Sequence, residues 1–323
     1  MNQKLQNILK ILEQSTNLSV EEKESAIKEL KNADKELEIT AFKLERTEKV
    51  KKTTAILLEE TIEELEQKRK AVEEQAKIIK AENDRKTKEL EDARQLQLAM
   101  LPKELPQLPN LDIAVYMKTA TEVGGDYYDF NIDANGTLTV LVGDATGHGM
   151  MSGMMVSIMK SFFIADRNNL ELKNFFDSSN KSIKDMQLGR LMMACMGVQI
   201  TSQKVIATNA GMPSLLYFRN KSQKAGEFVS NNMPLGAMKS SQYSLKEINY
   251  EKSDVLLLMS DGFAELKNVN NEQYGYQRTK ELFGSIAHKS SSEIIEELKN
   301  TASQWLDGSE PDDDVTFVVI KVK

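Results

Sequence analysis

Residues 140–149 read Val140-Leu141-Val142-Gly143-Asp144-Ala145-Thr146-Gly147-His148-Gly149, an apolar β-like run that ends on an acid among glycines. An aspartate at the end of an apolar strand stands where a rigid core meets solvent, so its carboxylate can be aimed accurately. Three other segments have the same form: residues 122–130 (EVGGDYYDF), 255–262 (VLLLMSDG) and 311–320 (PDDDVTFVVI). Each is an ordinary turn or loop in isolation. Together they predict that Asp126, Asp144, Asp261 and an acid from residues 312–314 converge.

Such a group of acids predicts a metal site. Converging carboxylates repel one another and are driven toward protonation, and divalent cations remove that penalty. Two cations roughly 4 Å apart can hold a phosphoryl group for in-line attack. His148 and His288 are too few for a histidine-rich site, and Cys195, the single cysteine, fits a core position. Oxygen ligands favour Mg²⁺ or Mn²⁺.

Residues 1–100 have the composition of long helices. They contain no glycine or proline and are dense in Glu, Lys, Leu, Gln and Ala, which are good helix formers. We predict a short helix over about residues 2–14, then a second that starts at a capping box, Ser19 to Glu22, and runs to about Met100. Leu101-Pro102 stops it, because proline disfavours helix at the preceding residue. The chain therefore divides into a helical region, 1–100, and a domain, 101–323.

A seven-residue repeat in the second helix predicts a coiled coil. A further leucine row, Leu30, Leu37 and Leu44, is in a shifted frame, which indicates a stutter or a break between residues 44 and 58. We expect a parallel homodimer that transmits a signal along a rod; the alternative is a single charged helix that packs on its own domain or spaces it. The two rows of the repeat are Leu58, Leu65, Val72, Ile79, Lys86, Ala93, Met100 and Ile62, Arg69, Ala76, Asn83, Leu90, Gln97.

From residue 101 short apolar runs alternate with Gly, Asn and Pro, which predicts an α+β fold with helices flanking a β-sandwich. The expected helices are residues 150–166, 170–187, 278–287 and 292–306. The expected strands are residues 113–119, 137–142, 191–200, 204–208, 215–218, 228–230, 245–250, 255–259 and 315–322.

In chain order the segments GGDYYDF, GDATGHG, NAGMP, MPLG, LLLMSDGFAE and DDDVTFVVIK resemble the bacterial PPM phosphatases of the RsbU/SpoIIE type. The resemblance covers about residues 95–323, and residues 97–102 (QLAMLP) resemble the junction of helix and domain in that family. It implies a PPM-type α-β-β-α sandwich and metal-dependent removal of phosphate from a serine or threonine of a regulatory phosphoprotein, by attack of a hydroxide that two ions share. It further implies a substrate of the STAS type, an anti-anti-sigma protein.

The resemblance also implies a ligand set. Asp126 and Asp144 would bind metal, with Asp144 bridging both ions and the Ala145 carbonyl as a backbone ligand. Asp261 would bind metal too. In the last motif the family's acid stands three residues before the threonine, so Asp313 would be the ligand.

Neighbouring residues are assigned other roles. Asp312 is expected in solvent, and Asp129 lies on the opposite strand face from Asp126 by alternation, so it is not expected to bind metal. For His148, at an expected helix start, a packing or capping role is favoured over a general acid. Met212 stands where many relatives have a histidine, so a contact from that side chain is absent.

Several function classes are disfavoured. A net charge of −7 with both signs abundant advertises no nucleic-acid surface, no apolar run reaches membrane-spanning length, and the N-terminus has no secretion signal. We expect a cytoplasmic enzyme whose helices bind an upstream regulator. A GGDEF-type cyclase would not account for the Asp261 and Asp313 motifs. The remaining alternative is a non-catalytic coiled-coil scaffold with a degenerate phosphatase-like domain.

Overall fold

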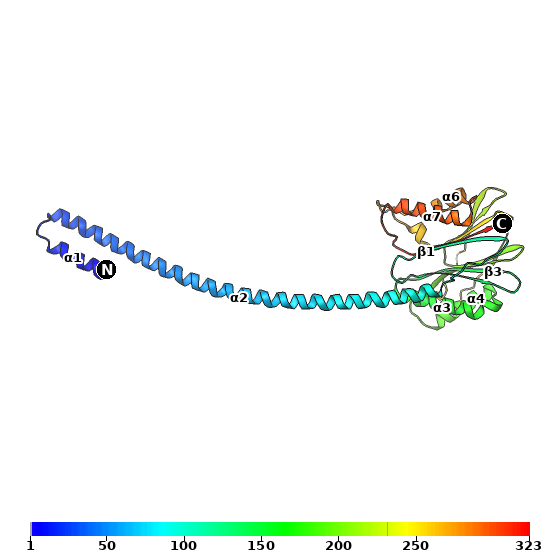
Figure 1. The fold of residues 1–323 in the computed structure, drawn as a ribbon, viewed down its shortest axis with the longest axis horizontal. Coiled ribbons are helices and arrows are strands. Elements are labelled where there is room, and N and C mark those ends of the chain that lie inside the picture. Colours follow the sequence, from blue (N-terminus) through cyan, green and yellow to red (C-terminus); the bar gives the residue numbers. More distant parts are fainter. Residues whose placement is uncertain (1, 231) are drawn as a thin grey trace. The chain divides into compact units, whose positions relative to one another are not determined.

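The computed structural model describes residues 2–230 and 232–323 and contains two compact units, one up to Asn83 and one from Asp84 to Lys323 (Figure 1). The second unit thus includes the last part of the long helix, residues 84–100, as well as the domain expected from residue 101. None of the helices in the described ranges combines the length and apolarity needed to span a bilayer.

The first unit is helical. Helix α1 spans Gln3–Gln14, and helix α2, which continues into the second unit, spans Val20–Met100. The capping box is confirmed, because the Ser19 N–H donates to Glu22 Oε2 at 2.8 Å and the Glu22 N–H donates to Ser19 Oγ at 3.3 Å. A stutter or a break was expected between residues 44 and 58. Helix α2 is continuous over these residues, so the prediction of a break is wrong. Apolar members of the repeat are exposed on the single chain: Leu58, Ile62, Leu65, Val72 and Ile79.

Ten strands in the second unit form two antiparallel sheets. One has the order β1-β10-β9-β6-β7 and the other β2-β3-β4-β5-β8. The bounds of the first sheet are β1 Leu111–Lys118, β10 Val315–Val322, β9 Val255–Met259, β6 Leu215–Arg219 and β7 Lys224–Phe228. Those of the second are β2 Asp126–Ile132, β3 Leu138–Ala145, β4 Met193–Ile200, β5 Lys204–Ala210 and β8 Lys246–Asn249.

Helices cover the outer face of each sheet, which makes the α-β-β-α sandwich (Figure 1). The β2–β8 sheet is covered by α3 (Met150–Asp166) and α4 (Leu172–Asp185), with a 3₁₀ turn at Arg167–Asn169 between them. The other sheet is covered by α6 (Tyr276–Ile286) and α7 (Ser291–Leu306), with the short α5 (Gly262–Glu265) at the end of β9. The expected fold class is confirmed.

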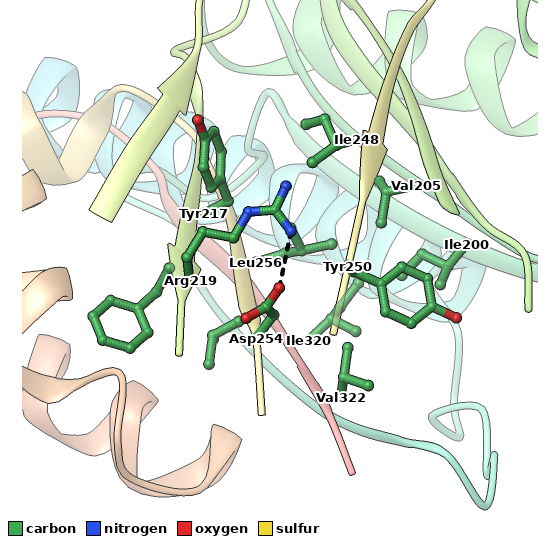
Figure 2. A pocket seen from close by; sticks show the side chains of 12 residues that line it. Ile200, Val205, Tyr217, Arg219, Ile248, Tyr250, Asp254, Leu256, Ile320 and Val322 are labelled. Atoms are coloured by element: carbon green, nitrogen blue, oxygen red, sulfur yellow. Dashed lines mark hydrogen bonds and ion pairs between the residues drawn. The ribbon is translucent and has the colours of Figure 1, made fainter. Parts of the chain in front are cut away.

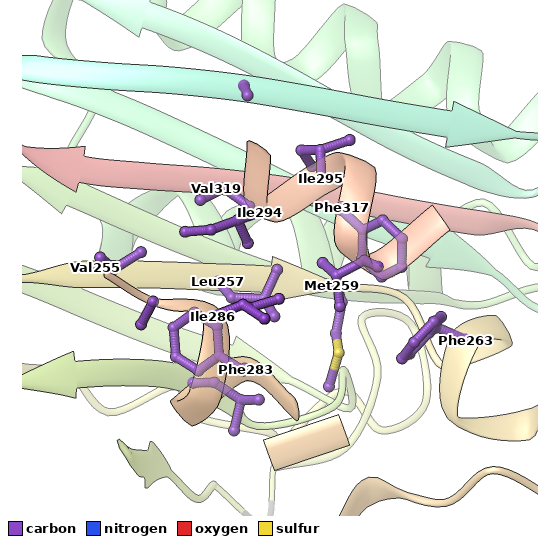
Figure 3. Close-up of a cluster of buried hydrophobic side chains, with 14 of the residues drawn as sticks. Val255, Leu257, Met259, Phe263, Phe283, Ile286, Ile294, Ile295, Phe317 and Val319 are labelled. Carbon is purple, nitrogen blue, oxygen red and sulfur yellow. The ribbon is translucent and has the colours of Figure 1, made fainter. Parts of the chain in front are cut away.

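Alternation along β9 divides the core into layers. Leu256 and Leu258 pack between the two sheets, while the residues of the other parity pack toward the helices (Figure 3). Each fully buried apolar side chain contributes about 1.5–3 kcal/mol, so these layers anchor the strand ends that carry the acids. The cluster in Figure 3 includes Val255, Leu257, Met259, Phe263, Phe283, Ile286, Ile294, Ile295, Phe317 and Val319.

Two strands differ from expectation. β2 was not predicted, because residues 126–132 mix acids and tyrosines in place of a plain apolar alternation. β7 ends at Phe228, where a strand over residues 228–230 was expected to begin. It lies at the edge of its sheet and carries charged residues, as edge strands commonly do to discourage further pairing.

A small apolar cavity lies between the sheets (Figure 2). It is lined by the start of β9 and the end of β10, whereas Asp261 follows the end of β9 and Asp313 precedes β10. The cavity is therefore at the end of the sandwich away from these two acids. Its volume is about 10 Å³, about enough for one water, and the Arg219 guanidinium donates to Asp254 across it at 2.9 Å. It is a packing gap and not a ligand site.

Candidate active site

The ends of four strands bring the predicted acids to one end of the sandwich. Asp126 begins β2 and lies directly opposite Asp144, near the end of β3, in the antiparallel register. Asp261 follows β9, and Asp313 stands two residues before β10, which pairs with β9. The Ser260 hydroxyl donates to Asp126 Oδ2 at 2.8 Å and so joins the two sheets at this point.

Asp126 is buried and oriented by two hydroxyl groups. Besides Ser260, Thr316 donates from Oγ1 to the same oxygen, Oδ2, at 2.6 Å. Ser260 Oγ in turn accepts the Thr316 N–H at 3.0 Å. Sequence reasoning did not assign Ser260 and Thr316, although both stand inside the quoted motifs. Their roles follow from the pairing of β9 with β10, which a strand pattern alone does not reveal.

Asp314 holds the loop that leads into Asp126. Its carboxylate is buried and accepts three backbone N–H groups, from Ala120 at 2.7 Å, Gly125 at 2.6 Å and Asp126 at 3.2 Å. Charge-assisted bonds of this kind are stronger than neutral ones. From the sequence, Asp314 was expected only as one of the possible acids of its run. No feature of residues 312–314 predicts that Asp314 holds this loop, because its hydrogen-bond partners lie almost two hundred residues away in the chain.

The acids raise one another's pKa. Burial, and then the charges of Asp261 and Asp313, raise the pKa of Asp144 to about 8. Burial and Asp313 raise that of Asp261 to about 6. For Asp126 burial comes first and Asp144 second, and the pKa lies well above its ordinary value. The pKa of Asp313 is raised mainly by burial.

This donor set fits a divalent metal. The leading charges that act on these four acids are other carboxylates, and the basic group His148 lowers the pKa of Asp313. Buried carboxylates without a counter-charge are costly, and hard cations with oxygen ligands offset that cost. Within the described residues, no three acidic, histidine or cysteine side chains already gather closely enough to hold one ion. The four acids lie close enough to raise one another's pKa, but their side chains do not surround a common point as the ligands of one ion would. The ligand set therefore stays a prediction.

Glycine is required at position 125, directly before β2, where the backbone passes close to β3. A Cβ on Gly125 would stand 2.9 Å from the Ala145 carbonyl oxygen and 3.0 Å from Asp144 Oδ1. The Ala145 N–H donates to the Gly125 carbonyl at 3.0 Å. The backbone of β2 therefore approaches the carbonyl and carboxylate that were predicted to bind metal, which only a residue without a side chain permits.

Asp129, Asp312 and His148 have environments different from those of the four acids. Asp129 accepts bonds from the Tyr127 hydroxyl at 2.7 Å and from Lys160 Nζ at 2.6 Å, so it belongs to a buried ion pair away from the acids. Asp312 is exposed and pairs with Lys267 at 2.8 Å. The packing or capping role favoured for His148 is wrong: its side chain is exposed, and the N-cap of α3 is Gly149 without a side-chain bond.

A groove of about 360 Å³ lies at the end of β9, where Met259 lines it two residues before Asp261. Burial, followed by the charges of Asp261 and Glu265, raises the pKa of its Tyr276 to about 12. Met212 lines the same groove, and its N–H donates to Asn209 Oδ1 at 2.8 Å. The lining residues are Met212, Pro213, Ser214, Leu216, Glu227, Val229, Met259 and Tyr276.

Known proteins resemble this chain in fold and, more distantly, in sequence. The SiaA-PP2C domain of Pseudomonas aeruginosa superposes with a TM-score of 0.67 at 18% identity, covering 75% of this chain and 98% of that domain. Phosphoserine phosphatase RsbU of Bacillus subtilis is 22% identical over 240 residues, 73% of this chain and 70% of RsbU. Protein IcfG of Synechocystis is 22% identical over 262 residues, 72% of this chain but only 41% of IcfG. The sandwich is thus that of the PP2C-type, or PPM, phosphatases.

The sequence profile of stage II sporulation protein E (SpoIIE) matches residues 134–323, more than half of the chain. The chain therefore belongs to the SpoIIE family, whose members are metal-dependent serine/threonine phosphatases of the PPM class. The matched range contains Asp144, Asp261 and Asp313, while Asp126 precedes it.

Proposed function

We propose that this chain is a cytoplasmic protein serine/threonine phosphatase that uses two Mn²⁺ or Mg²⁺ ions to dephosphorylate a regulatory phosphoprotein of the STAS type. The observation that carries the proposal is the meeting of Asp126, Asp144, Asp261 and Asp313 from four strand ends, where carboxylates are the leading charges that act on one another. Family membership supports the reaction class.

Each residue has a physical task in this proposal. Asp144, Asp261 and Asp313 would hold the cations together with Asp126, whose Oδ2 is fixed by two hydroxyls so that Oδ1 can turn to a metal. The Ala145 carbonyl would be a backbone ligand. Bound divalent cations supply Lewis acidity, which activates water and neutralises charge on the phosphoryl oxygens. Fixing the ligands on paired strands limits how far they must reorganise.

The groove at the end of β9 suits the polypeptide around a phosphorylated serine. Apolar side chains line much of it, with Glu227 and the Tyr276 hydroxyl as polar groups. A phosphoserine side chain is short, so the substrate backbone must come close to the metal site and its flanking residues must find a surface there. The groove offers that surface next to the acids.

Regulation would act through the N-terminal helices. Their exposed heptad residues favour a homodimer through a coiled coil, and an upstream regulator would bind the same helices. RsbU, a phosphoserine phosphatase by name, supports a phosphoserine as the target; the proposal extends this to a role in signal transduction that controls a sigma factor.

Hydrolysis of para-nitrophenyl phosphate tests the reaction class. The full chain with Mn²⁺ should turn over this substrate, and EDTA or Asp261→Asn should reduce turnover at least 100-fold, because the metal site is lost. Asp312→Asn is the matched control: it removes a carboxylate from the same end of the domain, one that pairs with Lys267 at the surface, and should leave the rate unchanged. Folded protein without turnover, or turnover indifferent to EDTA, would instead favour the non-catalytic scaffold.

A phosphorylated STAS protein tests the substrate class. Release of phosphate from its phosphoserine by the wild-type chain, and not by Asp261→Asn, is the expected result. If para-nitrophenyl phosphate is hydrolysed and several phosphorylated STAS proteins are not, the reaction class stands and the substrate proposal fails.

A further inference from the structure

One polar residue of helix α2 is buried. Gln97 is 3% exposed and is the buried residue of that helix among those described. Its amide makes two hydrogen bonds to the backbone of a single residue: Nε2 donates to the Gly124 carbonyl at 2.7 Å, and the Gly124 N–H donates to Oε1 at 3.2 Å. Both ends of the side-chain amide are thus used on one residue of the Gly124-Gly125-Asp126 loop.

Packing alone does not call for glutamine at this position. An unpaired buried amide costs free energy, and an apolar side chain would fill the same space among Val123, Gly153 and Met154. The two hydrogen bonds to Gly124 offset the cost of burying the amide only while the loop stays in its present position. Gln97 therefore defines where the Gly124 backbone lies, not merely how well the helix packs.

The other hydrogen bonds of the loop come from the catalytic domain, among them that of the Ala145 N–H to the Gly125 carbonyl at 3.0 Å. The Asp314 carboxylate accepts the N–H groups of Gly125 and Asp126, and Ser152 of α3 donates to the Gly124 carbonyl at 3.3 Å. Asp314 precedes β10 and Ser152 lies on α3, so each comes from the catalytic domain. Gln97 supplies the hydrogen bonds that come from α2, the helix that also carries the heptad repeat.

We infer that Gln97 is a positioning residue: by holding the Gly124 peptide it sets the place of Asp126 as a metal ligand and ties the end of helix α2 to the metal site. The inference rests on the proposed function, in which Asp126 binds metal. A shift or rotation of this helix end would break both bonds and release the loop on one side.

The test compares Gln97→Met with Gln95→Met in the full chain. Methionine has nearly the length of glutamine but no amide, and Gln95 is an exposed residue of the same helix that bonds only to Glu91. Hydrogen exchange of residues 119–126 is measured without metal, and Mn²⁺ binding is measured by calorimetry. In Gln97→Met we expect the Gly124 amide to exchange at least tenfold faster and Mn²⁺ to bind about tenfold more weakly, the effect of about 1.4 kcal/mol of lost hydrogen bonding. Gln95→Met should match the wild type in both.

A second variant separates the bonds from the fold. Gln97→Glu keeps an acceptor for the Gly124 N–H, so the exchange of that amide should stay close to the wild type even if the domain melts at a lower temperature. Gln97→Met with wild-type exchange and wild-type Mn²⁺ affinity overturns the inference. So does faster exchange with unchanged Mn²⁺ affinity, because Gln97 is then a purely structural contact.

Failure of the proposed function has a different signature. A folded wild-type chain that binds no Mn²⁺ overturns the metal site itself. In another outcome the wild-type chain binds Mn²⁺, Asp261→Asn does not, and Gln97→Met binds Mn²⁺ as tightly as the wild type. That result overturns only the role of Gln97.

Discussion

At the scale of single residues, Asp144 bears an electrostatic cost in the metal-free site, because its pKa is raised to about 8. We expect Asp144→Asn to stabilise the metal-free chain by about 1–3 kcal/mol, since an amide needs no proton to be neutral there. The same variant should lose at least 100-fold in Mn²⁺-dependent turnover. Thermal melts in EDTA and a phosphatase assay measure the two effects. A variant that melts below the wild type in EDTA would show that the carboxyl is better accommodated than its raised pKa implies.

The same residue predicts how stability depends on pH. The folded chain holds a proton on Asp144 up to a pKa of about 8, whereas an unfolded chain releases it near the ordinary value of 3.8. The folded state therefore binds more protons in this window, and the stability of the metal-free chain should fall as pH rises from about 4 to about 8. Asp261 adds to the slope up to about pH 6.

Melting temperatures of the EDTA-treated chain between pH 5.5 and 8.5 check this trend. Saturating Mn²⁺ should flatten it, because metal holds the carboxylates deprotonated. Asp144→Asn should flatten the part above pH 6. Stability that rises over this range in EDTA would be inconsistent with the raised pKa values.

At the scale of elements, the contact of β2 with β3 decides how closely backbone reaches the site. Gly125→Ala should destabilise the domain by about 1–3 kcal/mol through overpacking and weaken Mn²⁺ binding, because its Cβ would crowd the Ala145 carbonyl and Asp144 Oδ1. Gly284→Ala on α6 is the matched control, since its Cβ would make ordinary contact at 3.4 Å with Ala225. Urea unfolding and calorimetry measure the difference, and equal behaviour of the two variants would contradict the crowding.

Elements also explain why the site holds together from distant segments. The pairing of β9 with β10 places Ser260 beside Thr316, and both meet Asp126 of the other sheet. The hydroxyls thus position one acid, while Asp314 holds the loop before it. The neighbouring acids belong to strands whose inner faces are buried in the core, which limits their movement.

At the scale of the whole molecule, the two compact units predict separable behaviour. Removal of residues 1–83 leaves the unit Asp84–Lys323 and its Gln97 contact, so its melting temperature should stay within a few degrees of that of the full chain. If the heptads form a dimer, the truncated chain should be monomeric and the full chain dimeric. Analytical ultracentrifugation measures this directly. A monomeric full chain would contradict the coiled-coil dimer and favour the single-helix alternative.

Much of this fold was predictable because its signals are local. The capping box at Ser19 and the apolar runs of β9 and β10 depend on neighbours within a few residues, and the helix over residues 150–166 has its predicted bounds. The strands at the sheet edge and at the site were harder to predict from the sequence. β2 carries acids that serve the site and β7 lies at a sheet edge, so neither shows the apolar pattern of a core strand.

The sequence by itself determined the class of protein, the long helix, the α+β sandwich and the four candidate acids, because hydrophobic periodicity and short motifs are written in consecutive residues. Only the tertiary structure decided which groups support those acids. Ser260, Thr316, Asp314 and Gln97 act through contacts across 27 to 194 positions of sequence. A hydrogen bond depends on where two groups meet in space, and strand pairing and helix docking set that distance.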